Sequence, residues 1–204
     1  MIKEAINQIK TALLLLIILT ILTGFIYPLA VTALAQLFFP WQANGSLIKQ
    51  NGQFIGSNLI GQSFTSPSYF WGRPSATTPY PYNGSSSSGS NLGPSNPDLF
   101  TAVKNRITQL KQADPQNNKA VPVDLVTASG SGLDPEISPL AALYQVSRIA
   151  KARQIPASDV YNLINGYSKN RTWRLLGEPR INVMELNLAL DRLRIKHDQS
   201  SPNS

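Results

Sequence analysis

No charged side chain occurs between Lys10 and Lys49, and this gap limits how the chain can fold more than any other feature. An α-helix rises about 1.5 Å per residue, so about 20 apolar residues cross the roughly 30 Å of hydrocarbon in a bilayer. Residues 12–39 are apolar on every side, whereas a helix of a soluble domain keeps one polar face for water. The sequence therefore predicts one transmembrane helix that reaches the outer interface near residue 39.

The charges on either side of this helix predict its direction in the membrane. Two lysines precede the helix, and the next basic residue after it is Lys49. Cytoplasmic flanks carry an excess of lysine and arginine, so residues 1–11 are expected in the cytoplasm and residues 40–197 outside it. Trp41 follows two phenylalanines, a grouping typical of the aromatic belt at the outer membrane surface.

A cleavable signal peptide is the alternative for this segment. Ala33-Leu34-Ala35 before Gln36 resembles the small-residue site at which such peptides are cut. Against cleavage, the dense apolar core ends at Ile26, well before that site, and apolar residues resume at Leu37. Under either interpretation the domain that follows is exported.

Composition narrows the class of the exported domain. The 204 residues include no cysteine, so the domain has no disulfides and needs an ordinary hydrophobic core. The formal net charge is +7, but basic and acidic residues alternate along the chain and form no basic run. This pattern is typical of a solvated surface, and we expect no nucleic-acid partner.

The order of local signals predicts an α+β domain with a small sheet and several helices. Asn51-Gly52 between short apolar runs predicts a hairpin. Cap signals predict helices that begin after Asn96, Ser138 and Asn182, the last with Glu185 in a capping-box pair. Three further expectations are a strand over residues 121–127, a short helix from Val160 to Asn165 that Gly166 closes, and a disordered tail over residues 198–204.

Residues 65–97, here called the aromatic loop, lack any regular hydrophobic period. Their serine, proline and glycine content alone is typical of a flexible linker. Five aromatic side chains argue against a solvated spacer, because aromatic residues are depleted in disordered segments. We expect an ordered irregular loop packed on the domain or on a partner; the five are Tyr69, Phe70, Trp71, Tyr80 and Tyr82.

Residues for catalysis or metal binding are sparse, and we expect neither a catalytic site nor a metal site. The single histidine, His197, lies near the C-terminus, which argues against a buried Ser-His-Asp triad. The turn Ser129–Gly132 lacks the Gly-Lys-Ser/Thr of a phosphate loop. Asp124, Asp134 and Glu136 could offer oxygen ligands, but their spacing matches no known cation loop, so a capping role for Asp134 is preferred.

The predicted membrane helix has no ionisable residue, so it offers no proton or ion relay of its own. A single helix cannot enclose a pore, and a role in transport would therefore be that of an accessory to other subunits. Small residues permit close packing of a neighbouring helix, and a proline can kink the span. The positions concerned are Gly24, Pro28, Ala30 and Ala33.

Long strings of this sequence resemble the C subunit family (KdpC) of the Kdp-type potassium-transporting ATPase of bacteria. The resemblance covers the chain from the membrane helix to about Asp191. It is carried by FPWQANGSLI (39–48), GSNLIGQSF (56–64), YFWGRPSA (69–76), GSNLGPSNPDL (89–99), VPVDLVTASGSGLDPEISP (121–139) and GEPRINVMELNLALD (177–191). Glu136 departs from the family pattern, in which many members carry His.

The resemblance implies a non-catalytic subunit in the bacterial inner membrane, with its domain in the periplasm. It implies two partners, a channel-like potassium-translocating subunit and a P-type ATPase subunit, and a role as a catalytic chaperone that raises the affinity of the latter for ATP. The resemblance implies contact with ATP but no firmly bound cofactor. Partner or nucleotide contacts are expected at Arg73, Asn91, Ser129, Gly130, Ser131, Asp134, Gln145 and Arg148.

ATP is cytoplasmic, whereas the flanking charges place the domain outside, so any effect on ATP affinity is expected to be indirect. We therefore expect the domain to lie over the outer potassium entrance. A membrane-anchored module that binds a glycan or a small anion through Arg73 and the aromatic loop is the alternative function.

Overall fold

The computed structural model describes the backbone of residues 2–200 and the side chains of residues 2–193. The chain divides into two compact units, residues 1–47 and residues 48–204. His197 and the whole predicted tail, residues 198–204, lie outside the described side chains. The last helix continues to Ser200, so residues 198–200 are helical and not disordered as predicted, and residues 201–204 lie outside the described backbone.

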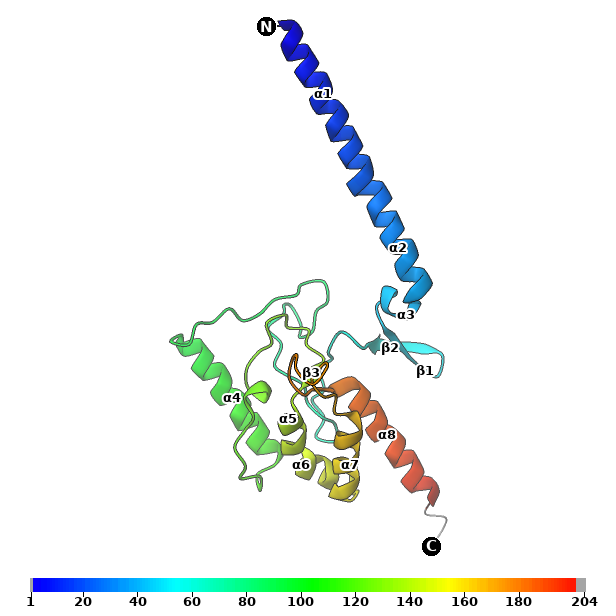
Figure 1. Ribbon diagram of the computed structural model, residues 1–204. Helices are drawn as coiled ribbons and strands as arrows, with labels where there is room; N and C mark the ends of the chain where they lie inside the picture. The colour runs from blue at the N-terminus through cyan, green and yellow to red at the C-terminus, as the bar shows by residue number, and fades with distance from the viewer. Residues whose placement is uncertain (1, 201–204) are drawn as a thin grey trace. The chain divides into compact units, whose positions relative to one another are not determined.

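The first unit is a long apolar helix followed by one short turn of helix. It comprises α1 (Ile2–Ile21), the π-helical turn η1 (Leu22–Ile26), α2 (Tyr27–Phe38) and α3 (Pro40–Ala43), and Figure 1 shows the first three as one continuous rod. By length and composition, residues 2–38 qualify as a membrane span, with a mean hydropathy of 2.5 and no buried residue in the most apolar window. A signal sequence satisfies the same criteria of length and composition.

The π turn lies directly before Pro28 and explains how the helix accommodates that residue. The Tyr27 N–H donates to the carbonyl of Leu22, five residues back instead of four. Proline has no N–H, and its ring crowds the carbonyl of the residue four positions earlier, here Gly24. A wider turn relieves that clash, so the predicted disturbance at Pro28 takes the form of a π turn.

The predicted hairpin near the start of the domain is confirmed. Strands β1 (Leu47–Gln50) and β2 (Gln53–Ser57) pair with each other. Asn51 and Gly52 have φ of 51° and 81°, which is the left-handed backbone that a two-residue type I′ turn requires.

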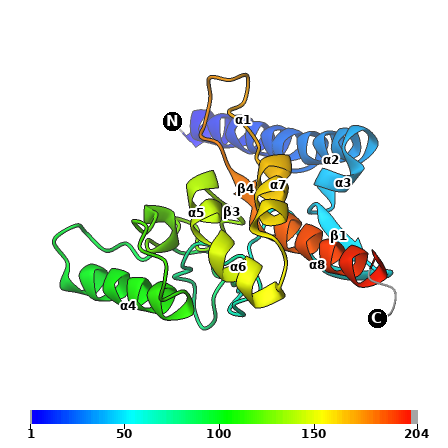
Figure 2. The same ribbon diagram turned by 90° about the horizontal axis from the view of Figure 1, so that it is seen from below.

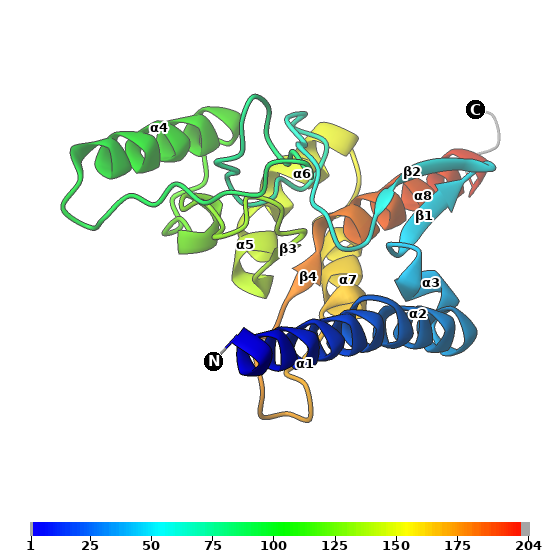
Figure 3. The ribbon, with the colours of Figure 1, turned by 90° about the horizontal axis from the view of Figure 1, so that it is seen from above.

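The domain is α+β, as predicted, and its core lies among five helices and a second two-stranded sheet. The helices are α4 (Pro97–Ala113), α5 (Pro139–Tyr144), α6 (Val146–Arg153), α7 (Ala157–Tyr167) and α8 (Val183–Ser200). Strands β3 (Glu136–Ile137) and β4 (Ile181–Asn182) are antiparallel, with Ile137 opposite Ile181. In Figures 2 and 3, α4 and α8 lie on opposite sides of the group formed by α5, α6 and α7. Buried residues at the centre include Leu125, Ile137, Ile149, Val160, Ile164, Ile181, Leu186 and Leu190.

Three predicted helix starts are confirmed by their caps. The Asn96 side chain accepts from the N–H of Asp98, and Ser138 Oγ accepts from the N–H of Ala141 at 3.0 Å. Asn182 Oδ1 accepts from the N–H of Glu185 at 3.1 Å, and the carboxylate of Glu185 forms an ion pair with Lys169. These caps satisfy N–H groups that the first turn of a helix leaves without partners.

The predicted strand over residues 121–127 is wrong. This segment contains the 3₁₀ turn η2 (Val123–Leu125), in which Leu125 is buried and Val123 points to solvent. Pro122 has no N–H for a sheet, and Asp124 accepts hydrogen bonds from the backbone and hydroxyl of Ser138. The apolar residues therefore hold a turn against the start of α5.

Two predicted helix boundaries are also wrong. The helix that begins after Ser138 is interrupted at Gln145, which separates α5 from α6. Helix α7 begins at Ala157 and continues through Gly166 to Tyr167, so Gly166 does not close it. A glycine inside a helix weakens it only modestly, and packing against α6 and α8 is sufficient here.

Candidate functional site

Two buried amide side chains fasten the aromatic loop to the helices. Gln145 Oε1 accepts from the Trp71 N–H at 2.8 Å, and Gln145 Nε2 donates to the Trp71 carbonyl at 3.1 Å. Asn187 binds both backbone groups of Phe70 in the same way, at 2.8 and 3.0 Å. The two side chains are 1% and 2% exposed. Because a buried backbone group without a partner costs about 1–3 kcal/mol, these amides fix the path of the loop, which confirms its predicted order.

Two guanidinium groups lie close to the ring of Trp71. The guanidinium carbon of Arg148 is 4.3 Å from the ring centroid, and that of Arg106 is 5.4 Å away. Arg148 also donates to Gln145 Oε1 at 2.6 Å and to two carbonyls of the loop, those of Pro67 and Tyr69. The ring and the carbonyls hold these cations by charge–quadrupole and charge–dipole attraction.

Neither cation forms an ion pair with a carboxylate in the part of the chain whose side chains are described. Burial lowers the pKa of Arg148 to about 10; the nearby charge of Arg106 lowers it further, and that of Asp114 opposes the shift. Burial also lowers the pKa of Arg106. Both remain protonated at neutral pH, so two positive charges lie beside the ring of Trp71.

A third arginine holds the start of the loop against α8. Arg153 Nε donates to the Ser68 carbonyl at 2.6 Å, and its Nη2 pairs with Asp191 at 2.8 Å. Its guanidinium carbon is 4.7 Å from the ring centroid of Tyr69, whose hydroxyl donates to the same carboxylate at 3.2 Å. The loop is thus secured along its first third by polar side chains from α6 and α8.

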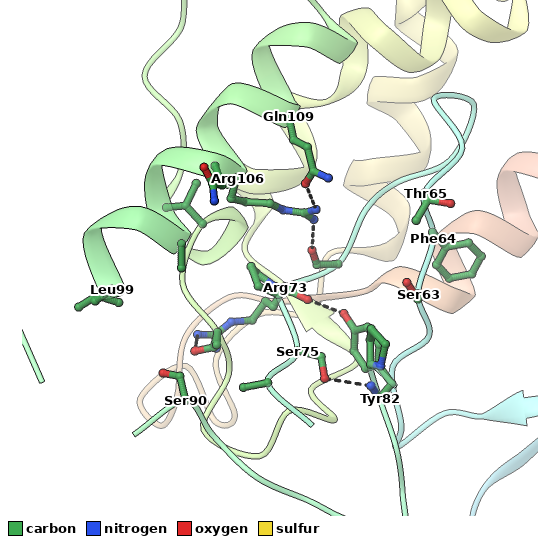
Figure 4. A pocket seen from close by; sticks show the side chains of 18 of the residues that line it. Ser63, Phe64, Thr65, Arg73, Ser75, Tyr82, Ser90, Leu99, Arg106 and Gln109 are labelled. Atoms are coloured by element: carbon green, nitrogen blue, oxygen red, sulfur yellow. Dashed lines mark hydrogen bonds between the residues drawn. The ribbon is translucent and has the colours of Figure 1, made fainter. Parts of the chain in front are cut away.

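A cavity of about 500 Å³ lies between α4 and the aromatic loop (Figure 4). Arg73 and Arg106 line it, and no lining residue is acidic. Arg73 Nη1 pairs with Asp134 at 3.1 Å, while its buried Nε has no partner among the described atoms. The Tyr82 hydroxyl donates to the Arg73 carbonyl at 2.6 Å, and burial raises the pKa of Tyr82 to about 12. The cavity can accommodate an anion, with apolar walls that include Phe64, Leu92, Leu99 and Val126.

The Gly/Ser turn packs against the far side of the loop. The Ser129 N–H donates to the Pro74 carbonyl at 3.2 Å, and the Ser131 carbonyl accepts from the Ser88 N–H at 3.0 Å. Gly132 has φ of +68°, and a Cβ there would lie 2.6 Å from the Ser88 carbonyl oxygen. Glycine is therefore required for this close approach, and the turn serves as a platform for the loop.

In the structure the predicted contact residues other than Asn91 lie in two groups along the aromatic loop. Arg73, Asp134 and the turn Ser129–Ser131 surround one part of the loop, and Gln145 and Arg148 lie beneath another. Asn91 is exposed beside Ser90, which lines the cavity, and none of the hydrogen bonds described for side chains 2–193 involves Asn91.

A nucleotide does not fit against Gln145 and Arg148 in this arrangement. Their side chains are buried, and they bind the backbone of the loop. A nucleotide could reach them only after the loop left the helices. The predicted ATP contact at these two residues thus requires a large rearrangement.

Each of the three carboxylates weighed as a cation ligand has an internal partner. Asp124 caps Ser138, Asp134 pairs with Arg73 and accepts from the Glu136 N–H at 3.0 Å, and Glu136 pairs with Arg180 at 3.1 Å. The preferred capping role of Asp134 is confirmed, and Glu136 is half-buried in its ion pair.

Sequence reasoning did not identify Arg106, Arg153 or Asn187 as important. A usable signal existed for Asn187, because it lies four residues after Val183 and three before Leu190, both buried. A polar side chain at that spacing is on the buried face and must find a partner there. Nothing local in the sequence indicates that the partner is Phe70.

The small residues of the apolar helix do not form one stripe. Gly24 and Pro28 are four apart and Ala30 and Ala33 are three apart, so each pair shares a face. The step of two residues between the pairs turns the helix by about 200°. A partner helix could therefore approach on two sides.

Comparison with known proteins identifies the family. The model of the family described as "K+-transporting ATPase, c chain" matches residues 9–192. The chain is 58% identical to a potassium-transporting ATPase KdpC subunit of Methylococcus capsulatus over 93% of this chain and 100% of the relative. A KdpC subunit of Herpetosiphon aurantiacus is 58% identical over 91% and 96%, and one of Paraburkholderia phytofirmans is 54% identical over 92% and 98%. The chain therefore belongs to the KdpC family of potassium-transporting ATPase subunits.

Proposed function

We propose that this protein is the non-catalytic accessory subunit of an ATP-driven potassium uptake pump and that the complex needs it for assembly. Its partners are a channel-like potassium-translocating subunit and a P-type ATPase subunit. Family membership over residues 9–192 is the observation that carries the proposal. The apolar helix supports it, because a single helix with no charged side chain after Lys10 offers no ion pathway and depends on other subunits for transport.

The proposed topology is a cytoplasmic N-terminus, one span of the inner membrane and a periplasmic domain over the potassium entrance. Lys3 and Lys10, which precede the uncharged stretch of the helix, support this direction. The effect on ATP affinity that defines a catalytic chaperone is then transmitted through the other subunits. The burial of Gln145 and Arg148 under the loop is consistent with an indirect effect.

Co-expression with the other pump subunits tests the assembly role. We expect the tagged full chain to retain both large subunits in detergent and the complex to take up potassium in liposomes. A chain that ends at residue 47 should insert but lose either the complex or potassium uptake. Full uptake with that truncated chain would refute the assembly role, and a raised KM for ATP in a partly assembled complex would support the chaperone role.

A second candidate function is an anchored anion-binding module, and the cavity that Arg73 and Arg106 line favours it. This function predicts that the full chain purifies alone as a stable protein. Phosphate or citrate should then raise its melting temperature, and Arg106→Gln should abolish that increase. The pump-subunit proposal predicts no such anion dependence.

A further inference from the structure

Residues 169–180, here called the tip hairpin, form a projection between α7 and β4 whose two arms pair with each other. Lys169 and Arg180 exchange both backbone hydrogen bonds at 2.9 and 3.0 Å, and Thr172 and Leu176 exchange both at 2.9 Å. Arg171 Nη2 donates to both carboxylate oxygens of Glu178 at 2.7 Å, which links the two arms. Figures 2 and 3 show this segment extending away from the other elements of the domain.

The end of the tip hairpin exposes large apolar side chains together. Trp173 is 85% exposed, Leu175 is 76% exposed and Leu176 is 52% exposed. Three side chains of this size expose on the order of 400 Å² of surface, the size of patch that marks an interaction site on many proteins. Packing within the domain does not explain why these residues are present.

The turn at the end of the tip hairpin is strained. Trp173 and Arg174 have φ of 52° and 63°, in the left-handed region that bulky residues rarely adopt. The turn of the first hairpin has the same left-handed backbone at Asn51-Gly52, two residues that adopt it far more easily. Strain kept by bulky residues at an exposed position points to a functional reason for their side chains.

An apolar groove of about 670 Å³ lies at the foot of the tip hairpin. Its lining includes Gly177–Arg180 of the tip hairpin itself, together with Val123 and Leu140. The charged side chains in the lining include the ion pairs Arg73–Asp134 and Arg180–Glu136. The side chains of Val123 and Leu140 are 70% and 71% exposed. The projection and the groove are therefore continuous. The exposed side chains of Trp173, Leu175 and Leu176, here called the knob, lie at the end of the hairpin whose foot lines the groove.

We propose that the tip hairpin and this groove dock an apolar segment of another subunit of the same pump, with Trp173 as the anchor residue. This inference rests on the proposed function and names the surface that it requires. Tryptophan and arginine are the residues most enriched among those that dominate binding energy at protein interfaces. Pairing between the arms holds the knob in one conformation before binding, which lowers the entropy lost on docking.

A subunit of the pump suits this surface better than a lipid bilayer or a second copy of the chain. Anionic lipid attracts clusters of basic residues, whereas Arg171, Arg180 and Lys169 of the tip hairpin already have acidic partners, which leaves Arg174 as the one cation of this hairpin outside the described ion pairs. An independent dimer needs about 1,200 Å² or more of buried surface. A smaller contact is sufficient when a membrane helix already holds the subunits together.

The decisive variant combines Trp173→Asn with Arg174→Gly in the full chain. It removes the knob but provides residues that prefer the left-handed turn, so the melting temperature of the purified protein should stay equal or increase. Retention of the co-expressed pump subunits in detergent should fall by at least about fivefold. A merely structural role for Trp173 would lower the melting temperature instead. Phe100→Ser, which removes an aromatic side chain that is 65% exposed on α4, is the matched control and should leave retention unchanged.

Two measurements support or overturn the inference independently of that variant. Leu140→Ser in the groove should also lower retention severalfold. A photoreactive benzophenone residue at position 173 of the assembled complex should crosslink to another pump subunit. Crosslinks only to lipid or to a second copy, or full retention by the double variant, would overturn the inference and leave the proposed function intact. Failure of the unaltered chain to retain either subunit would overturn both.

Discussion

The aromatic loop and the tip hairpin use similar residues for opposite purposes. Trp71 of the loop is 6% exposed with two guanidinium groups near its ring, whereas Trp173 of the tip hairpin is 85% exposed beside Arg174. The loop has almost no regular structure and depends on Gln145 and Asn187 for its backbone partners. The tip hairpin satisfies its own backbone and leaves its aromatic side chain free.

This difference shows that regular structure and burial are separate properties in this domain. A segment that satisfies its own backbone can project and present side chains to a partner. A segment that cannot do so must lie on a surface that offers amides and guanidiniums, and its aromatic rings become part of the core. The same residue type therefore stabilises the domain at position 71 and, by our inference, binds a partner at position 173.

The largest expected effect comes from making the same change in both regions. Trp71→Ala should lower the free energy of unfolding by about 3–5 kcal/mol, because it leaves a buried cavity and deprives two cations of their ring. Trp173→Ala should change it by less than about 0.5 kcal/mol, since the side chain is exposed. Urea unfolding of the full chain in detergent, followed by circular dichroism, measures both. Equal losses would mean that the two regions do not differ as described.

The next largest effect comes from Gln145, which together with Asn187 forms the amide clamp that binds the backbone of the aromatic loop. Gln145→Met should lower the free energy of unfolding by about 2–3 kcal/mol, because both backbone groups of Trp71 then lose their partner inside the protein. The matched control is Gln109→Met on α4, whose side chain is exposed and accepts a single bond from Arg106. We expect the control to change stability by less than about 0.5 kcal/mol in the same urea experiment. A comparable loss in both variants would argue that the clamp is not what holds the loop.

Much of the fold could be predicted because its signals are local. The caps at Asn96, Ser138 and Asn182 and the turn at Asn51-Gly52 each depend on a few neighbouring residues. The path of the aromatic loop could not be predicted, since Phe70 and its partner Asn187 are 117 positions apart. The sequence did not predict the tip hairpin either, because Trp173-Arg174 is not a typical turn sequence.

The candidate site was predictable only in part, because its contacts also join segments that lie far apart in the sequence. Gln145 lies at the right spacing to share a buried face with Ala142 and Ile149, which marks it as a residue that needs a partner. The strand expected over residues 121–127 failed because Pro122 and Asp124 favour a turn that a count of β-branched residues does not detect. The sequence thus indicates which side chains need partners, but not which distant segment provides them.

The smallest expected effect is a pH dependence of the stability that arises from Tyr82 in the aromatic loop. The pKa of Tyr82 is about 12 in the folded protein and 10.0 as the ordinary value, so the unfolded chain loses this proton first as pH increases. Its contribution to stability is complete below pH 10 and is lost between about pH 10 and 12, reaching a loss of about 1.4 kcal/mol at pH 11. Tyr82→Phe removes the hydrogen bond to the Arg73 carbonyl, which lowers stability by about 1 kcal/mol at pH 8.

At pH 11 the two proteins should therefore become nearly equal in stability. Arg148 has a lowered pKa and acts in the opposite direction at alkaline pH, but it is present in both proteins and cancels in the difference. The control is Tyr80→Phe, in the same loop but exposed, which should leave the difference from the unaltered protein close to zero at both pH values. A constant gap between the Tyr82→Phe variant and the unaltered protein from pH 8 to 11 would show that the hydroxyl of Tyr82 is not buried by the docked loop.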